Sequence, residues 1–209
     1  MAVRNIIFDL GGIFLDIHYE RTRLAFLELG LTDFDTYYQQ SFASPLFAKL
    51  EKGEVEPSFF YSTFREETGL QASDDAIAAA WSAMLGDFRP ASIAVLPALK
   101  QDYNLYLLSN TNKIHHAAFC AKYSAAFGGQ AFDDHFIFAH YSHLLGLHKP
   151  DVACYQKVLD MHGLSAVETL FVDDTPKNIE GARQAGLQTG WLQHGTLLEN
   201  EIGKFLANA

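Results

Sequence analysis

The chain has 209 residues, of which 49% are hydrophobic, so it can bury a real core and form one domain with a large insertion or two small domains. Its 25 acidic residues outnumber its 15 basic ones, and the formal net charge is -10 at pH 7. This surplus argues against binding nucleic acid or an anionic membrane through a general basic surface. A small metabolite is therefore the expected partner.

The sequence carries no signal for a membrane or an oxidising compartment. No apolar run approaches the roughly 20 residues that span a bilayer, and residues 1–4 lead directly into an apolar stretch without a signal-peptide pattern. Cys120 and Cys154 lack a metal-binding spacing, so we expect reduced thiols. We expect a cytoplasmic protein with no membrane partner, either a monomer or a homodimer.

The N-terminal stretch joins an apolar strand to a carboxylate and two glycines. Residues 5–8 are apolar apart from the first, and Asp9 follows them, with Gly11 and Gly12 close behind. In an open α/β sheet, ligands bind beyond the carboxyl ends of the strands, so this arrangement makes Asp9 a candidate catalytic residue. The plainer interpretation is that Asp9 caps a helix and that the glycines only form a turn.

Helical periodicity dominates the next part of the chain, from His18 to about Gly86. We predict helices over residues 19–29, 34–42, 45–51, 57–68 and 74–85, with no strand between them. The aromatic residues there recur at helical spacing and are expected to form a bundle core: Phe26, Phe34, Phe42, Phe47, Phe59, Phe60, Phe64 and Trp81. The turn Glu51-Lys52-Gly53 could reach a substrate, although a simple helix end explains it as well.

After Arg89 the pattern alternates between helices and strands. Helices are expected over residues 90–101, 113–126, 151–162 and 176–185, and strands over 104–108, 136–139, 169–172 and 188–192. Strands separated by helices form a mostly parallel sheet covered on both faces. The expected fold class is α/β, a Rossmann-like doubly wound parallel sheet of residues 1–16 and 90–209 with an inserted helical bundle of residues 17–89.

Polar side chains follow several of these strands. Ser109 and Asn110 come at the end of one strand, where a hydroxyl and backbone donors suit an anion, although such turns are common. Lys149 opens a helix, where its charge has the wrong sign for the helix dipole, which indicates a role there. Asp173 and Asp174 end a buried strand and would repel each other and Asp9 by about 4 kcal/mol per close pair. Mg²⁺, which prefers oxygen ligands, would relieve this repulsion.

In order and spacing, these stretches resemble the motifs of the haloacid dehalogenase-like hydrolase superfamily. Asp9 matches the family's nucleophile, Ser109 the hydroxyl of its second motif, Lys149 the lysine of its third and Asp173-Asp174 the acidic pair of its fourth. The resemblance covers the whole chain, because the helical stretch looks like the cap that these enzymes insert after the nucleophile strand. The Phe-Asp-Leu-Gly start and the Ser-Asn-Thr-Asn motif look most similar to sugar-phosphate phosphatases, in particular the α-glucose-1-phosphate phosphatase branch.

The resemblance implies a Mg²⁺-dependent phosphatase that acts on a small phosphorylated metabolite through an aspartyl-phosphate. Asp9, the Gly11 carbonyl and Asp173 or Asp174 would hold the metal. Lys149 would add a fixed positive charge beside Asp9 and the phosphoryl group. The phosphoryl oxygens would be held by Ser109, Lys149 and the backbone around Gly11, Gly12 and Asn110.

One departure from the family pattern concerns the residue two positions after the nucleophile. Phosphatases of this group usually carry an Asp there as acid and base, a contribution typically worth about 10²- to 10⁴-fold, whereas this chain has Gly11. The enzyme could act on a good leaving group such as an anomeric sugar phosphate. It could recruit another acid, for which Asp16 and His18 are the nearest candidates. It could also have lost turnover and serve as a binding or regulatory protein.

Dehalogenation is a further alternative, because it requires neither an acid nor a metal. It would leave the charges of Asp173 and Asp174 without a partner, which disfavours it. Three other residues are weaker candidates. Arg89 could contact phosphate at the hinge, Asn178 could orient Asp174 or Lys149, and Gly181 could permit close helix packing.

Overall fold

The computed structural model describes residues 2–39 and 42–209 of the chain. A five-stranded sheet lies at its centre, with strand order β7-β6-β1-β8-β9 and every neighbouring pair parallel. The strands are β1 (Asn5–Phe8), β6 (Asn104–Ser109), β7 (Phe138–Tyr141), β8 (Thr169–Asp173) and β9 (Gln188–Trp191). The chain starts at the middle strand and builds outward on one side and then the other, so the predicted doubly wound sheet is confirmed.

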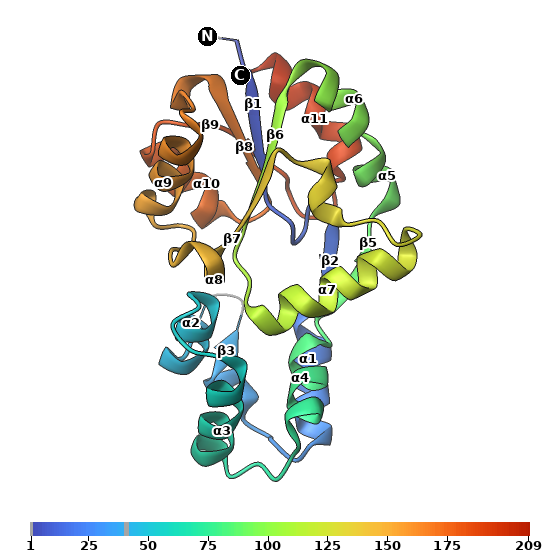
Figure 1. The fold of residues 1–209 in the computed structure, drawn as a ribbon, viewed down its shortest axis with the longest axis vertical. Coiled ribbons are helices and arrows are strands. Elements are labelled where there is room, and N and C mark those ends of the chain that lie inside the picture. Colours follow the sequence, from blue (N-terminus) through green and yellow to red (C-terminus); the bar gives the residue numbers. More distant parts are fainter. Residues whose placement is uncertain (1, 40–41) are drawn as a thin grey trace.

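Alternation along the strands explains why both faces of the sheet are covered. In β1, Ile6 and Phe8 pack into one core cluster while Ile7, between them, packs into another. Figure 1 shows a helical layer on each face of the sheet. The first face is covered by α5 (Pro90–Ala94), α6 (Leu96–Asp102), α7 (Lys113–Ala126) and α11 (Leu198–Ala207), and the second by α9 (Val152–His162) and α10 (Pro176–Gln184).

A helical insertion lies between β1 and β6, below the sheet in Figure 1. It contains α1 (Tyr19–Glu28), η1 (Phe34–Thr36), α2 (Pro45–Glu51), α3 (Pro57–Thr68) and α4 (Asp74–Ser82). An antiparallel ribbon of β2 (Leu15–Ile17) and β5 (Leu85–Phe88) connects it to the sheet. The insertion has its own apolar core, which Phe26, Phe47 and Trp81 fill without any exposure. The carboxyl ends of the central strands face this insertion.

The prediction of uninterrupted helices in the insertion was wrong in two places. Residues 34–42 do not form a helix. They form η1 and the hairpin β3 (Tyr38–Gln39) with β4 (Phe42–Ala43), and residues 40–41 lie outside the described part. The helix predicted over 74–85 ends at Ser82, because Thr22 Oγ1 donates to the Trp81 carbonyl and accepts from Met84 N. A long-range hydrogen bond therefore ends a helix that local periodicity would continue.

Other elements differ in smaller ways. The helix predicted over 90–101 is divided into α5 and α6 at Val95, just before Pro97, which has no N–H to donate. Phe59 was expected in the insertion core but is 54% exposed, and the side chain of Phe42 is not described. Six further short or terminal elements were not predicted: β2, β5, η2 (Phe132–His135), α8 (Ser142–Leu145), η3 (Ala166–Glu168) and α11. No helix among the described residues is both long and apolar enough to cross a membrane.

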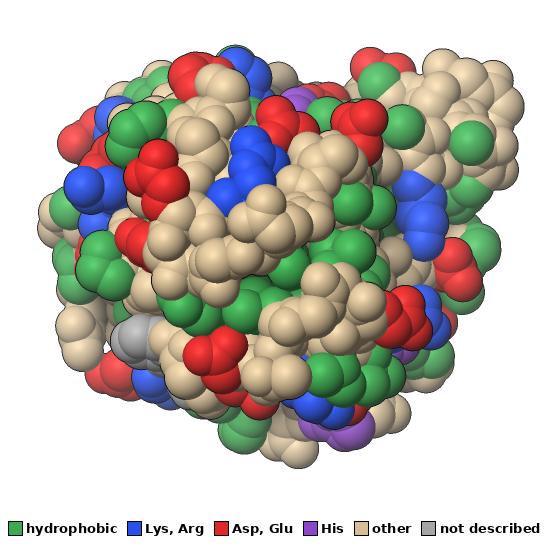
Figure 2. Space-filling view, turned by 90° about the horizontal axis from the view of Figure 1, so that it is seen from below, with side chains coloured by type: hydrophobic (Ala, Val, Ile, Leu, Met, Phe, Trp, Pro, Cys, Tyr) green, Lys and Arg blue, Asp and Glu red, His purple; other side chains and the backbone are tan. Residues whose placement is uncertain are grey.

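The surface at the insertion end carries mixed charges. Figure 2 shows basic side chains scattered among acidic ones on this face rather than gathered in one patch. This distribution agrees with the excess of acidic residues in the sequence.

Candidate active site

Parallel pairing brings three carboxylates together at one edge of the sheet. Phe8 lies beside Val172 in the pairing of β1 with β8, so Asp9 and Asp173 come at the ends of adjacent strands. Asp9 N donates to the Val172 carbonyl at 2.9 Å. Asp9, Asp173 and Asp174 each offer an oxygen within 4.8 Å of the others. The structure therefore gathers the acidic residues that the sequence predicts at these strand ends.

Lys149 provides the positive charge at this cluster. Its Nζ lies 2.8 Å from Asp9 Oδ1 and 2.7 Å from Asp173 Oδ2, and the side chain is 1% exposed. Burial alone would lower the pKa of Lys149, but the charges of Asp173 and Asp9 outweigh it and raise that pKa. Lys149 is therefore a fixed cation between two carboxylates.

Asn110 holds the backbone that carries Lys149. Its Nδ2 donates to the Lys149 carbonyl at 2.8 Å, and its Oδ1 accepts from Lys149 N at 2.9 Å. The amide side chain thus joins the loop after β6 to the segment before α9. This contact explains the position of Asn110 without requiring that it touch a ligand.

Asp173 and Asp174 differ in the hydrogen bonds they already make. Asp173 is fully buried, and its two oxygens accept from Thr175 N at 2.7 Å, from Lys149 Nζ and from Asn178 Nδ2 at 3.2 and 3.0 Å. Asp174 accepts from the hydroxyl of Thr175 at 3.2 Å. Its Oδ2 lies against Gly12, where an added Cβ would come within 2.0 Å. Asp174 therefore accepts fewer hydrogen bonds from the protein than Asp173 does.

The charges at this cluster are incompletely balanced by protein groups. Burial raises the pKa of Asp9, Lys149 opposes this, and the charges of Asp173 and Asp174 raise it further. Burial and the charge of Asp173 also raise the pKa of Asp174. One lysine faces three acids, so an oxygen-preferring divalent cation fits the donor set.

The loop after Asp9 is shaped by Gly12 and Arg89. Gly12 has φ +72, which glycine adopts without strain, and this brings it against Asp174. The Arg89 guanidinium donates to the Gly12 carbonyl, and its Nε lies 2.7 Å from Asp16 Oδ1. Arg89 therefore supports the loop, and Asp16 is held in this ion pair. Gly11 adds no side chain to the site.

The loop after β6 is held by contacts with α7 and α8. Ser109 ends β6 and is 3% exposed, and Asn112 caps α7 by accepting from Ile114 N and His115 N. Ser142 Oγ accepts from Thr111 N at 2.9 Å and lies 2.7 Å from both the Thr111 and Glu51 carbonyl oxygens. Ser142 was not predicted, because its role depends on two contacts distant in sequence.

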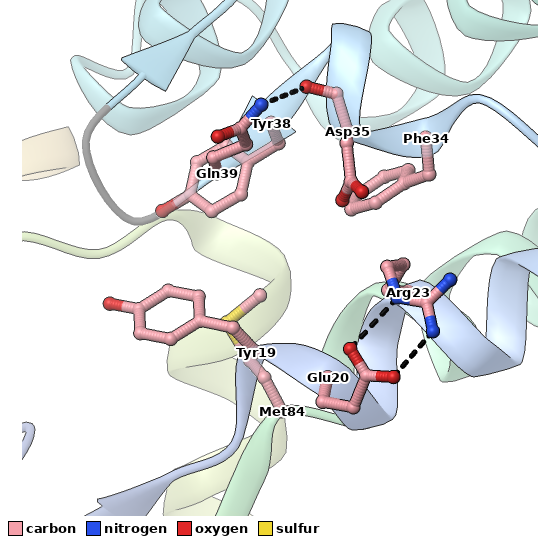
Figure 3. Close-up of a pocket in the computed structure, with 8 residues that line it drawn as sticks. All are labelled: Tyr19, Glu20, Arg23, Phe34, Asp35, Tyr38, Gln39 and Met84. Atoms are coloured by element: carbon pink, nitrogen blue, oxygen red, sulfur yellow. Dashed lines mark hydrogen bonds and ion pairs between the residues drawn. The ribbon is translucent and has the colours of Figure 1, made fainter.

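The helical insertion reaches this loop through the turn after α2. An added Cβ on Gly53 would lie 2.0 Å from the His143 carbonyl oxygen, which shows how closely the turn approaches α8. Beside it, Tyr38 and Tyr19 contribute to a cavity of about 320 Å³ (Figure 3). The lining residues are Tyr19, Glu20, Arg23, Phe34, Asp35, Tyr38, Gln39 and Met84. The two tyrosines were not predicted, because their approach depends on how the insertion folds.

Two other candidates have structural surroundings that explain them. Asn178, on α10, bonds both oxygens of Asp173 rather than Asp174 or Lys149. Gly181 faces the Pro150 carbonyl, which would lie 2.2 Å from an added Cβ, so its predicted role in close packing is confirmed. His18 Nε2 would lie 2.8 Å from a Cβ on Gly86, which places it at the ribbon that joins the insertion to the sheet.

Comparisons with known proteins agree with this geometry. A family model described as a haloacid dehalogenase-like hydrolase matches residues 3–186. The chain is 27% identical to a D-ribitol-5-phosphate phosphatase of Bacteroides thetaiotaomicron over 201 residues, 96% of this chain and 97% of that protein. It is 30% identical to a sesquiterpene phosphatase of Aspergillus oryzae over 184 residues, 87% of this chain and 85% of the relative.

A solved structure gives a further match. It is the crystal structure of a mutant haloacid dehalogenase family enzyme from Bacteroides thetaiotaomicron, in complex with magnesium and inorganic phosphate. It has a TM-score of 0.91 and 27% identity to this chain, and the match covers 96% of this chain and 99% of that one.

Proposed function

The chain belongs to the haloacid dehalogenase-like hydrolase family, and from this we propose that it is a Mg²⁺-dependent phosphatase of a small phosphorylated metabolite. The observation that carries the proposal is the cluster of Asp9, Asp173 and Asp174 around Lys149 at the strand ends. The magnesium and phosphate bound by the similar crystal structure, and the two phosphatases among the relatives, support the same chemistry.

In this proposal Asp9 attacks phosphorus and forms an aspartyl-phosphate, which a water molecule then hydrolyses. Lys149 lies against Asp9 and stabilises negative charge on the phosphoryl group. Ser109, Lys149 and the backbone of Gly11, Gly12 and Asn110 hold the phosphoryl oxygens. The metal would be held by Asp9, the Gly11 carbonyl and Asp174, and it would reduce the repulsion between the carboxylate and the phosphate dianion. Asp173, whose oxygens are already occupied, would support the site by fixing Lys149.

The same proposal divides the chain into two parts. Residues 1–16 and 90–209 form the catalytic core, and residues 17–89 form a cap that covers the strand ends. The separate apolar core of the insertion and its connection through the β2–β5 ribbon support this division. The cap would exclude water and contact the leaving group.

The leaving group is proposed to be a sugar or a polyol. Polar side chains from the cap line the cavity in Figure 3, among them Tyr19, Tyr38 and Gln39, which suit hydroxyl groups. A relative that hydrolyses ribitol 5-phosphate supports this class. The finer prediction of a 1-phosphate, drawn from the resemblance to α-glucose-1-phosphate phosphatases, stays a prediction.

The experiment is phosphate release from ribitol 5-phosphate and from sugar 1- and 6-phosphates, with and without Mg²⁺. We expect Mg²⁺-dependent release that falls by at least about 10³-fold in Asp9→Asn, because the variant lacks the nucleophile. Asp160→Asn, an exposed change on α9, is the matched control and should retain activity. If the wild-type protein binds Mg²⁺ but releases no phosphate from any ester, the non-catalytic alternative suggested by Gly11 replaces this proposal.

A further inference from the structure

The carboxyl of Glu51 lies where the cap meets the core. Glu51 is the last residue of α2, and its carbonyl accepts from Ser142 Oγ, which also bonds Thr111 in the loop after β6. Two residues later, Gly53 lies against the His143 carbonyl. The turn that carries Glu51 is therefore docked on the loops at the strand ends.

One oxygen of this carboxyl, Oε1, is hydrogen-bonded, and the other, Oε2, has no hydrogen bond among the described residues. Tyr38 donates its hydroxyl to Glu51 Oε1 at 3.1 Å. Within residues 2–39 and 42–209, no side chain or backbone group hydrogen-bonds Oε2. Burial raises the pKa of Glu51, and the smaller effects of the Tyr38 hydrogen bond and the nearby His148 lower it. Burial thus favours the protonated form of this carboxyl, and the described residues leave Oε2 without a hydrogen bond.

Tyr19 connects this position with the core carboxylates. Burial raises the pKa of Tyr19 to about 12, and the charges of Asp174, Asp9, Glu51 and Asp173 all add to the rise. The phenol therefore lies within the fields of both the cap carboxyl and the metal-binding cluster. Figure 3 shows Tyr19 and Tyr38 side by side, with both hydroxyls directed away from the Glu20–Arg23 pair.

Asp16, the other carboxyl that the sequence suggests as a replacement acid, is already paired with an arginine. Asp16 is bonded to the Arg89 guanidinium, which also holds the Gly12 carbonyl. The Asp16 side chain is therefore held by Arg89 at the loop after Asp9. Among the described residues no arginine or lysine pairs with the Glu51 carboxyl. The titratable groups that act on it are Tyr38 from β3 and His148 from the segment before Lys149, while Ser142 of α8 donates only to the backbone carbonyl of Glu51.

We propose that Glu51 supplies, from the cap, the proton that the core cannot supply because Gly11 replaces the usual acid. This inference rests on the proposed phosphatase function. As Asp9 bonds to phosphorus and the ester P–O bond breaks, the Glu51 carboxyl gives its proton to the departing oxygen. A water molecule then attacks phosphorus, the bond to Asp9 breaks, and the proton of that water returns Glu51 to its acid form. The products are the free alcohol and inorganic phosphate.

The test compares Glu51→Gln with the wild type on two esters in the presence of Mg²⁺. Ribitol 5-phosphate has a poor leaving group that needs a proton, so kcat/KM should fall by about 10²- to 10⁴-fold. p-Nitrophenyl phosphate has a leaving group that departs as the anion. For that ester we expect a first turnover at the wild-type rate, seen as a burst of one nitrophenolate per site, followed by slow hydrolysis of the aspartyl-phosphate.

Two further variants separate chemistry from structure. Glu51→Asp keeps a carboxyl and should recover part of the lost activity on ribitol 5-phosphate. Glu54→Gln changes an exposed carboxyl in the same turn and should behave as the wild type on both esters. An equal loss on both esters without a burst, or equal activity of Glu51→Gln and Glu51→Asp on ribitol 5-phosphate, overturns the inference. A wild-type protein without Mg²⁺-dependent turnover overturns the proposed function itself, and the inference with it.

Discussion

The two adjacent acids at the end of β8 have different surroundings, so we expect them to perform different tasks. Asp173 accepts hydrogen bonds from a backbone amide, a lysine and an asparagine, so its oxygens are directed inward. Asp174 faces the loop of Gly12 and has fewer partners. A carboxylate whose lone pairs are already used is a poor direct ligand, but it can fix the charges around a ligand. The position of Lys149 therefore depends on Asp173 as well as on Asp9.

Substitution of Asn178 tests whether Asp173 must be held in place for metal binding. Its side-chain amide donates to both oxygens of Asp173, and its backbone carbonyl accepts from the Tyr155 hydroxyl at 2.7 Å. In Asn178→Ala, Asp173 loses one of its anchors, so Asp173 and the Lys149 that it fixes are no longer held in one arrangement beside Asp9 and Asp174. We expect Mg²⁺ affinity, measured by titration calorimetry, to fall by about 10- to 100-fold, as is usual for groups that orient a metal site. Lys177→Ala, an exposed change on the same helix, should leave the affinity unchanged. Equal affinities in both variants would contradict this account of Asp173.

At the scale of elements, the position of α10 depends on one close backbone contact. Gly181 faces the Pro150 carbonyl, and this approach keeps the helix that carries Asn178 beside the segment that carries Lys149. In Gly181→Ala the new methyl group would overlap the carbonyl oxygen, and one of the two segments must move. We expect the free energy of unfolding, measured with urea, to fall by about 1–3 kcal/mol.

Gly203→Ala is the matched comparison for this helix contact. Gly203 lies inside α11, and nothing lies within 4 Å of the position of an added Cβ. Alanine in an open helical position should stabilise the protein by about 0.5–1 kcal/mol, because glycine loses more backbone freedom on folding. Opposite signs for the two substitutions are therefore expected. If Gly181→Ala is also stabilising, the close approach does not control the position of α10.

The same comparison of elements shows what the sequence could predict. The strands of the sheet were identified because residues such as Ile6, Ile7 and Phe8 form short apolar runs that are buried on both faces. The acidic pair was identified because it ends such a run. The hairpin of β3 with β4 and the end of α4 were not, since both depend on contacts between residues distant in the chain, such as Thr22 with Trp81.

The residues of the candidate site likewise include some that the sequence could predict and some that it could not. Asp9 and Asp173 could be proposed from sequence, because parallel strands bring their carboxyl ends to one edge. Lys149 could be proposed because its charge has the wrong sign for the start of a helix. Tyr19, Tyr38 and Ser142 could not, because their places depend on how the cap docks on the core. Glu51 could be named as a candidate, but its surroundings became visible only with the hydrogen bond from Tyr38.

For the molecule as a whole, the helical insertion, our proposed cap, is joined to the sheet and its helices by a buried histidine as well as by the ribbon of β2 and β5. His115, on α7, stacks on the Trp81 ring of α4 with centroids 4.4 Å apart. Its Nε2 lies 2.9 Å from the Trp81 carbonyl oxygen, to which a neutral ring with Nε2–H donates. A charged ring there would be buried between two apolar layers. Docking of the cap therefore favours the neutral form of His115.

This contact should make stability depend on pH. Burial lowers the pKa of His115 from 6.5 to about 4, although the Trp81 carbonyl opposes the shift. Between these values the unfolded chain binds one more proton than the folded one at this residue. The contribution of His115 is complete above pH 6.5 and declines as the pH falls toward 4, by up to about 1.4 kcal/mol per pH unit.

The measurement is the free energy of unfolding of the wild type and His115→Gln at a series of pH values between 4 and 7 in metal-free buffer. Glutamine can donate to the Trp81 carbonyl but does not titrate, so the advantage of the wild type should shrink as the pH falls. Groups such as Asp9, whose raised pKa gives a slope of opposite sign, are common to both proteins and cancel in the difference. His194→Gln, at an exposed position, should follow the wild type throughout. A wild-type advantage that does not change with pH would show that His115 is not held neutral between the cap and the core.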